Sequence, residues 1–578
     1  MLEHDISFGG MTIPTGGWKK AWYFLRTYIL TIPRFDLFLQ GALLIVILLE
    51  SNVYLLLRRN AGTGFLRSVN EDWLRIGSAG AEFLFGAVLA WWGRTLRHLA
   101  LSGWLGISAA SGLIVLAFPY EESNPLVVEL CGGGTISVYG VTVGVEDTYV
   151  AARDAFLVIT AVLCALTRIS IWAHGLTYLD DHEPQNGPYF YGILISIRLS
   201  LGLNGQSWLR PAAVQESWWH AHLSLCMLTL MFSVLFTLFP KRMPQLKEVD
   251  LEDDEETGLI SSVCRLMRNK SLMTQTLALS FLYTGLFGFI NYDNEFVQAR
   301  YHIETLREDP RTTRAINDIF RSLVIIFFVS VFRVRFSMRR SDGVKANTAS
   351  RVGGVVALFV CAFFVVLAAI GCATGRVAGI YDAYEQPACS AECGCNTAIY
   401  GFSPVCALET STTYFSPCDA GCNQYEDLNG FVLFENCTCG VRGGRMTRGS
   451  CTVASCQSTY SFYLLFFALV LASSGASVVM QGMVVMRAVR RPDKPLALGL
   501  SCAIIALLAH LLGHLLYMLI SYLSCAYYEN GVCVFHHHTI WWMGATSAIF
   551  CLLSATMSLV ASRIPPIPGV LLTVDHPS

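Results

Sequence analysis

The sequence predicts an all-α polytopic membrane protein of about twelve helices in two six-helix halves, with a small disulfide-rich extracellular lobe. Only 14% of the residues are charged and 54% are hydrophobic, whereas a soluble globular protein has roughly 25% charged residues. The apolar residues lie in long runs, many of them near the length that crosses about 30 Å of hydrocarbon. More than half of the 20 cysteines fall between Cys372 and Cys456, which indicates an oxidising compartment for that segment.

The apolar runs define the predicted transmembrane helices. We expect these near residues 35–57, 76–92, 99–118, 154–178, 188–205, 218–239, 272–290, 316–332, 352–371, 460–486, 496–523 and 540–561. The fifth and eighth spans are the weakest, because Arg198 and Arg321 interrupt them and charge is costly in hydrocarbon.

The spans divide the chain into domains. We expect a cytoplasmic N-terminus (1–34), an N-terminal six-helix half (35–239), a cytoplasmic linker (240–271), helices 7–9 of the second half (272–371), the extracellular lobe (372–459), helices 10–12 (460–561) and a cytoplasmic tail (562–578). The linker carries the acidic run Asp250 to Glu256 and is interpreted as a solvated mobile connection rather than a partner site.

Positive charge orients the spans, because Lys and Arg accumulate in cytoplasmic loops. With the N-terminus inside, the density of Lys and Arg is clearly higher in the predicted cytoplasmic segments than in the external ones. The runs from Arg333 to Lys345 and from Arg487 to Lys494 contribute most. Both termini are therefore predicted to be cytoplasmic and the cysteine-rich segment external, where disulfides persist.

Disulfides are expected to hold the lobe together, because so few large apolar residues cannot do so by burial alone. The cysteines assigned to disulfides are Cys389, Cys393, Cys395, Cys406, Cys418, Cys422, Cys437, Cys439, Cys451 and Cys456, with Cys525 and Cys533 bridging a later loop. Their pairing in the lobe cannot be read from sequence, and a zinc cage at Cys393-x-Cys395 and Cys418-x3-Cys422 is the disfavoured alternative. Asn436-Cys437-Thr438 is an external glycosylation acceptor, whereas Asn269-Lys270-Ser271 lies in the internal linker and is expected to stay unmodified.

Short motifs carry a resemblance to a known family. Pro404-Val405-Cys406 and the block from Tyr414 to Cys422 resemble the Kazal-type loop of the organic anion transporting polypeptides, with Asp419 where that loop usually has histidine. Weaker likenesses in the spans run from residue 40 to about residue 525. They are Gln40-Gly41, Glu82, the segment from Gly175 to Asp180 and Asp181, Tyr191 to Leu194, the signature pair Trp218 and Trp219, and Ala497 to Leu500.

The resemblance implies a function and an architecture. It implies the major facilitator fold, whose two halves rock around a central cavity, in the plasma membrane. It also implies sodium-independent transport of bulky amphipathic anions such as bile salts, steroid sulfates, prostanoids or thyroid hormones. Trp218 and Trp219 would be gate residues, although membrane-interface anchors explain them equally well. Nothing indicates an enzyme, a cofactor, a metal site or a nucleic-acid partner, and protein partners stay unknown.

Three cations remain inside the predicted spans, namely Arg168, Arg198 and Arg321. Arginine stays charged at membrane depth and can bind a carboxylate or sulfate with two donors. Arg198 is the preferred substrate-binding candidate, since its span usually lines the cavity of such a bundle. For Arg168, an ion pair with Glu50 or Glu82 is an equal alternative.

The sequence also departs from the family. An arginine usual in the eleventh span is replaced by Ala506, and His510 and His514 follow it. These histidines could form a titratable cavity pair, but neutral packing against a neighbouring helix is favoured. The run from His536 to His538 is interpreted as a solvated external loop. A transport-inactive relative, acting as a receptor or regulator through its lobe, is therefore the alternative function.

At the outer end of the third span, this chain has Tyr120 where the family often has a histidine linked to stimulation by low pH. Because tyrosine does not titrate near neutrality, we expect no acid stimulation through that position. Uptake measured against external pH in wild type and Tyr120→Phe checks this. A rise at acid pH that Tyr120→Phe abolishes would contradict it.

Overall fold

The computed structural model describes most of the helical bundle and the lobe. It describes residues 6–8, 11–13, 30–59, 71–118, 127–137, 147–183, 187–199, 218–241, 258–301, 346–372, 377–380, 384–407, 409–428, 431–440, 444–451, 454–529, 532–536 and 538–565, with 323, 324, 327 and 331. Tyr120 and Arg321 lie outside these ranges, as do most of the predicted eighth span and the side chain of Trp218.

Ten helices in the described ranges are long and apolar enough to cross a membrane, and they coincide with ten of the predicted spans. The helices of the first half are α2 (Ile32–Arg59), α3 (Glu71–Trp92), α4 (Arg97–Val115), α5 (Asp147–Ser170), α6 (Thr177–His182), α7 (Gly187–Leu199) and α9 (Trp218–Thr237). Those of the second are α10 (Leu259–Met267), α11 (Lys270–Asn291), α12 (Asp293–Tyr301), α14 (Ala346–Ala369), α16 (Ala454–Arg487), α17 (Lys494–Ile505), α18 (His514–Leu523) and α19 (Trp542–Ala561). The fifth predicted span corresponds to α7, whose apolar stretch is shorter than the other spans. The all-α membrane fold is confirmed.

Two spans contain π-helical turns. The segment η2 (Ile171–Leu176) joins α5 to α6, and η5 (Ala506–Gly513) joins α17 to α18. Such widened turns often occur at functional sites, because they leave backbone groups and side chains in positions that a regular helix does not allow.

The two halves approach each other closely where α3 crosses α17. Gly499 of α17 faces Gly86 and Ala90 of α3, and a Cβ at position 499 would lie 2.8 Å from the Gly86 carbonyl oxygen. Small residues allow such close backbone packing between membrane helices. A larger side chain here would push the halves apart.

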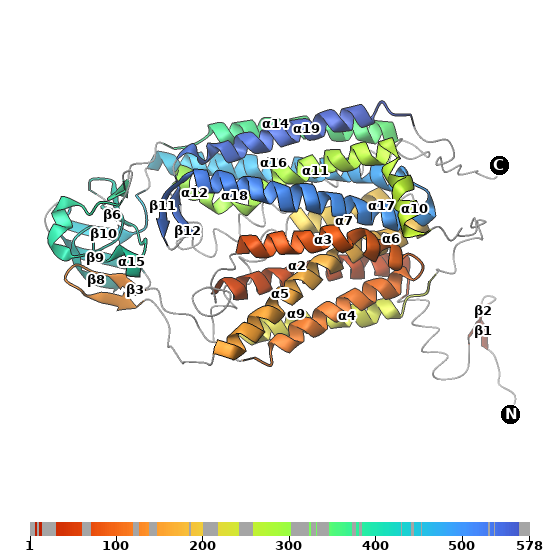
Figure 1. The fold of residues 1–578 in the computed structure, drawn as a ribbon, viewed down its shortest axis with the longest axis horizontal. Coiled ribbons are helices and arrows are strands. Elements are labelled where there is room, and N and C mark those ends of the chain that lie inside the picture. The colour runs from red at the N-terminus through yellow and green to blue at the C-terminus, as the bar shows by residue number, and fades with distance from the viewer. Residues whose placement is uncertain are drawn as a thin grey trace.

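The lobe lies at one end of the bundle, and α10 and the start of α17 lie at the opposite end (Figure 1). We call these the lobe end and the opposite end. The lobe sheet has the strand order β5-β7-β6-β10-β9-β8. Its strands are β5 (Val377–Ala378), β6 (Val405–Ala407), β7 (Thr412–Tyr414), β8 (Cys422–Leu428), β9 (Phe431–Cys437) and β10 (Gly444–Arg448).

Every cysteine assigned to a disulfide from the sequence forms one. The bonds within the lobe are Cys389–Cys439, Cys395–Cys418, Cys406–Cys451 and Cys422–Cys437, and Cys372–Cys456 closes its base. Cys525 is bonded to Cys533. Because the sulfur atoms of the suggested zinc cage are all in disulfides, that cage does not form.

Asp419 occupies the interior of the lobe. Its carboxylate accepts hydrogen bonds from the Tyr384 hydroxyl at 2.5 Å and the Ser416 hydroxyl at 2.6 Å. Burial raises the pKa of Asp419, and burial together with the bond to that carboxylate raises the pKa of Tyr384. The residue that replaces the usual histidine is therefore an internal hydrogen-bond acceptor.

A hairpin from the first half is bonded to the lobe. Its strands β3 (Val127–Glu129) and β4 (Thr135–Ser137) lie between α4 and α5, and Cys131 forms a disulfide with Cys393. The Cys131 backbone N–H also donates to the Cys422 carbonyl oxygen at 2.8 Å, and Glu129 accepts from the Asn396 backbone N–H at 2.8 Å. Neither Cys131 nor Cys372 was assigned to a disulfide from the sequence.

The interpretation of His536 as part of a solvated loop is wrong. His536 ends β12 (Val532–His536), which pairs with β11 (Cys525–Glu529), and it is buried. Its Nε2 lies 3.0 Å from the Ser521 hydroxyl and 3.3 Å from a Glu295 carboxylate oxygen. Polar partners on α18 and α12 explain why this histidine is inside.

The end of the predicted linker is ordered as α10. Arg265 of this helix pairs with Asp493 at 2.8 Å. Asn269 caps the N-terminus of α11 by accepting from the Leu272 backbone N–H, and its side-chain amide donates to the Ala488 carbonyl oxygen at 2.8 Å. The Asn269 amide is therefore engaged between α11 and the end of α16, and the absence of a glycan on it stays a prediction.

The Cys131–Cys393 bond predicts that the halves remain covalently joined after the linker is cut. With a protease site inserted between Asp250 and Glu256, the cleaved chain should run as one band without reductant and as two with it. Cys131→Ser combined with Cys393→Ser should separate the fragments without reductant. Cys525→Ser, which breaks a bond within the second half, should not. Joined fragments in the double variant would refute this pairing.

Candidate functional site

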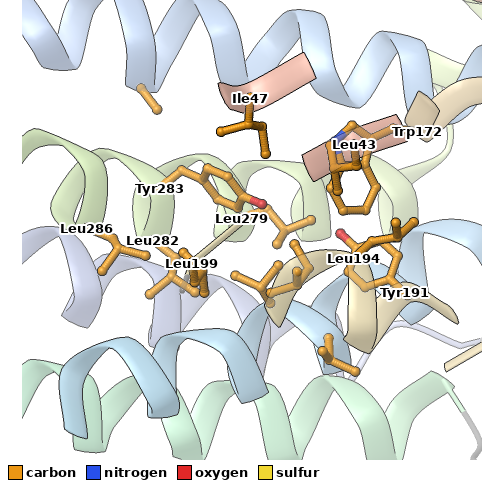
Figure 2. Packing of buried hydrophobic residues seen from close by; sticks show 14 of the residues in the cluster. Leu43, Ile47, Trp172, Tyr191, Leu194, Leu199, Leu279, Leu282, Tyr283 and Leu286 are labelled. Carbon is orange, nitrogen blue, oxygen red and sulfur yellow. The ribbon is translucent and has the colours of Figure 1, made fainter. Parts of the chain in front are cut away.

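A cavity of about 50 Å³ lies between the two halves. The first half lines it from α3, α5, η2 and α7, and the second from α11, α16, α17 and η5. Trp172, Tyr191 and Tyr283 form aromatic parts of its wall. Figure 2 shows these rings among Leu43, Ile47 and Leu279, where side chains of both halves meet. The cavity wall is thus largely apolar and aromatic.

Arg168 is held by two carboxylates. Its Nη1 donates to Glu50 of α2, and its Nη2 donates to Glu82 of α3 at 2.7 Å. Both alternatives for its ion pair are therefore present at once, and Arg168 and Glu82 also line the cavity. Because three helices meet at this guanidinium, it fixes the packing of the first half.

Arg198 lies between the halves and, unlike Arg168, contacts aromatic rings. Its guanidinium lies 5.6 Å from the centre of the Tyr283 ring and 5.0 Å from that of Phe287, both on α11. Cations are attracted to aromatic faces. Among the described residues no carboxylate forms an ion pair with Arg198, so it is the cavity cation whose charge is least compensated by direct contact.

The two histidines of the eleventh span have separate environments. His510, in η5, lines the cavity, with its ring 5.6 Å from that of Phe287. His514 is buried one turn further along, where its Nε2 lies 3.1 Å from an Asp72 oxygen of α3. They do not form a cavity pair in this conformation.

Polar contacts close the interface at the lobe end. Besides the contact of His514 with Asp72, Arg75 of α3 donates to the Asn291 side-chain oxygen of α11 at 2.5 Å. The Asn291 amide also lies 3.5 Å from His514 Nδ1. Each contact with α3 joins one half to the other.

A second set of contacts closes the opposite end. Lys494, at the start of α17, lies 2.5 Å from Asp180 and 3.5 Å from Asp181, both on α6. Arg97 of α4 pairs with Asp181 at 2.5 Å. The side chains of Lys494 and Asp180 are only 9% and 8% exposed, so neither charge could stay there without the other.

The remaining predicted site residues either lie away from the cavity or have side chains that the structure does not describe. Trp219, the second residue of α9, is 43% exposed and does not line the cavity. Its role as a gate residue or an interface anchor stays a prediction. For Trp218 only the backbone is described, and Arg321 lies outside the described residues.

Sequence reasoning missed residues that act only across the interface. Lys494 lies just before the predicted span 496–523, and Asp72, Arg75 and Arg97 also lie outside the predicted spans. The position of Lys494 next to the start of an apolar run could have indicated a functional cation. Its partner Asp180 could not be found in this way, because it is more than 300 positions away. Trp172 and Tyr283 could not be recognised as cavity residues, because the sequence contains many other aromatic residues.

The arrangement is suited to hold an anion with an apolar body. Arginine donors can bind the anionic group, and aromatic rings can pack against the body. Pockets for drug-sized ligands have volumes of roughly 300–1,000 Å³, so the cavity of about 50 Å³ between the described residues is small for a bulky ligand.

Comparisons with known proteins find similarity to organic anion transporters. The model of the Organic Anion Transporter Polypeptide (OATP) family matches residues 212–539. Solute carrier organic anion transporter family member 6C1 of Mus musculus is 22% identical over 422 residues, which cover 63% of this chain and 57% of that protein. Member 2B1 of Homo sapiens is 32% identical over 167 residues, 27% of this chain and 23% of that protein. The chain thus matches little more than half the length of the first relative and about a quarter of the second.

Solved structures give a weaker likeness. FucP, a Major Facilitator Superfamily transporter in the outward conformation, is similar with a TM-score of 0.48 and 10% identity, over 91% of this chain and 98% of that chain.

Because Lys494 and Asp180 join the halves at the opposite end, we expect the substitution Lys494→Met to open the interface there. Removing one partner of a buried pair costs about 3–5 kcal/mol, and each 1.4 kcal/mol is about tenfold in an equilibrium. In Lys494→Met, the maleimide labelling rate of Cys502, which lines the cavity, should therefore rise at least about tenfold in detergent-solubilised protein.

The other free cysteines (Cys164, Cys226, Cys264, Cys361 and Cys551) are replaced by alanine in this test. Arg265→Ala is the matched control, because Arg265 is half exposed and its pair lies within the second half. An unchanged rate in Lys494→Met would show that this pair does not hold the end closed.

Proposed function

The chain belongs to the organic anion transporter polypeptide family, and on that premise we propose that it carries bulky amphipathic organic anions across the plasma membrane. The family expected from the lobe and span motifs is confirmed. The observation that carries the proposal is the cavity between the halves, in which Arg168 and Arg198 lie among aromatic side chains.

The cavity chemistry supports amphipathic substrates. Arg198 is the proposed anchor for the carboxylate or sulfate, since its guanidinium contacts rings rather than a carboxylate. Trp172, Tyr191 and Tyr283 would contact the apolar body. Bile salts, steroid sulfates, prostanoids and thyroid hormones combine these two features, and transport would be independent of sodium.

The proposed mechanism is alternating access. The halves, 35–239 and 272–561 joined by the linker 240–271, would rock about the cavity so that one end opens while the other stays closed. The contacts of Lys494 with Asp180 at one end and of Asp72 with His514 at the other support this, because they join the halves at opposite ends. In the described part of the chain, contacts between the halves are present at both ends.

The proposed orientation places the lobe outside the cell and both termini in the cytoplasm. Disulfides persist outside the cell, and seven of them lie at or near the lobe end. Asn436 is exposed on β9 and would carry a glycan there.

The alternative is a transport-inactive relative that acts as a receptor or regulator through its lobe. An uptake screen with labelled organic anions in transfected cells separates the two, since only a transporter gives saturable uptake. Family and fold point to transport rather than to an enzyme.

Arg198→Ala should impair uptake without lowering the amount of protein at the cell surface. Loss of a charge-assisted hydrogen bond costs about 1.5–3 kcal/mol, so the KM for a steroid sulfate should rise roughly 10- to 100-fold. Arg445→Ala is the matched control, because Arg445 is 68% exposed on the lobe. Unchanged uptake kinetics in Arg198→Ala, with surface biotinylation equal to wild type, would exclude Arg198 as the anchor.

A further inference from the structure

Helix α10 is too short to cross a membrane and does not follow the direction of the spans. Its nine residues, Leu259–Met267, extend about 14 Å, whereas the hydrocarbon layer is about 30 Å thick. Only Arg268 and Asn269 separate it from α11, and the extended backbone of Asn269 interrupts the helical path. Figure 1 shows α10 lying across the opposite end of the bundle, whereas α11 runs along it. The helix therefore lies where α11 reaches the edge of the hydrocarbon.

One face of α10 packs on the second half. Arg265 pairs with Asp493 at 2.8 Å, and the Asn269 side-chain amide donates to the Ala488 carbonyl oxygen at 2.8 Å. The buried and half-buried residues of this face are Leu259, Ser262, Val263 and Leu266. These contacts fix the helix to the turn between α16 and α17, and they define which side chains face outward.

The outer face of α10 carries an apolar stripe. Ile260 is 78% exposed, the largest exposed fraction among the large apolar side chains of the described residues, and Met267 is 56% exposed. Cys264 is exposed as well. With 3.6 residues per turn, positions 260, 264 and 267 lie one above another on the helix. Water is an unfavourable environment for such a stripe, so it indicates a contact with apolar material outside the described part of the chain.

Cations lie beside this stripe. Arg265 and Arg268 occupy neighbouring positions around α10, and Lys270 begins α11. Arg490 lies in the turn that α10 contacts, since its carbonyl oxygen accepts from the Asp493 backbone N–H. We call these four exposed residues the α10 cluster. Asp493 is nearly buried and bound by Arg265, and within the described ranges no carboxylate forms an ion pair with the other three cations. The outward charge is therefore positive.

Phospholipid matches both the stripe and the α10 cluster. Amphipathic helices at membrane surfaces place apolar side chains among acyl chains and Lys or Arg among headgroups. Clusters of four or more such cations next to a span attract anionic lipid. A protein partner is less well matched, because a stable protein interface buries about 800 Å² on each partner, and this stripe lies on a helix only about 14 Å long.

We propose that α10 binds anionic phospholipid at the membrane surface, with the apolar stripe among the acyl chains and the α10 cluster on the headgroup phosphate and carboxylate. In the proposed orientation this is the cytoplasmic leaflet, whose surface is negatively charged. Because α10 joins the linker to α11, the bound lipid holds this end of the linker at the membrane surface. The lipid site lies outside the cavity, so the inference goes beyond the proposed function.

The acidic run from Asp250 to Glu256 is the competing partner for the same cations, because it precedes α10 closely in the sequence. It offers carboxylates to the α10 cluster. Leu251 is its one apolar residue, so it offers little to the exposed stripe. Lipid accounts for both features at once, and the experiment separates the two partners.

The first measurement locates α10. A bimane dye is attached to Cys264 of the purified full chain, with the five other free cysteines replaced by alanine, in nanodiscs of phosphatidylcholine. A nitroxide near the top of an acyl chain should quench the dye. Aqueous iodide should quench it several-fold less than it quenches the glutathione adduct of the same dye. Ile260→Gln combined with Met267→Gln should weaken the nitroxide quenching. Iodide quenching equal to that of the adduct would place the helix in water and overturn the proposal.

The second measurement tests the charge, with nitroxide-labelled phosphatidylserine in place of labelled phosphatidylcholine. Each engaged cation should raise the association constant of the anionic lipid roughly fivefold. Arg268→Gln combined with Lys270→Gln should therefore lower this constant by about fivefold per residue. The constant for phosphatidylcholine should not change, which shows that α10 stays folded in place.

Arg34→Gln is the matched control and should leave both constants unchanged. Arg34 is an exposed cation at the same end but in the first half, where its neighbour Phe35 packs against Tyr178 of α6.

Equal constants for the two lipids in wild type would overturn the proposal. A preference for phosphatidylserine that appears only after the acidic run from Asp250 to Glu256 is replaced by Asn and Gln would assign the α10 cluster to the linker, and it would overturn the proposal as well. None of these measurements uses transport, so the proposed function stands or fails separately.

Discussion

Charge compensation in a medium of low dielectric constant governs this bundle. Arg168 can lie at membrane depth only because Glu50 and Glu82 contact its guanidinium from two other helices. The same requirement joins α2, α3 and α5, since moving any one of them would leave a buried charge without its partner. The ion triad therefore stabilises the first half and also places a cation beside the cavity.

The interface between the halves follows from the same constraint. Lys494 and Asp180 are nearly buried, yet they belong to different halves. When such a pair separates, water must reach both charges, so the end that holds it is either closed and dry or open and hydrated. Arg198 is the exception in the middle, because its partners are the rings of Tyr283 and Phe287. A cation held by rings remains able to bind an anion.

The lobe is stabilised by another means. Burial in a small domain supplies too little free energy, and disulfides restrict the unfolded chain instead. Asp419 adds an internal polar link to Tyr384 and Ser416. Aromatic contact between Phe415 and Tyr527, at 5.1 Å, seats the lobe on the second half. Because Cys131 comes from the first half, the lobe contacts both halves.

The sequence by itself determined ten of the spans, the disulfide-rich lobe and the family, because these depend on local composition and on cysteine spacing. Apolar runs mark helices wherever they lie, and Arg168 and Arg198 stood out as cations inside them. Only the tertiary structure decided which partners each charge has. Lys494 with Asp180, His514 with Asp72 and Cys131 with Cys393 join positions hundreds of residues apart, and no local pattern encodes such contacts. The burial of His536 was missed for the same reason, since it depends on Ser521 and Glu295, which belong to two other helices.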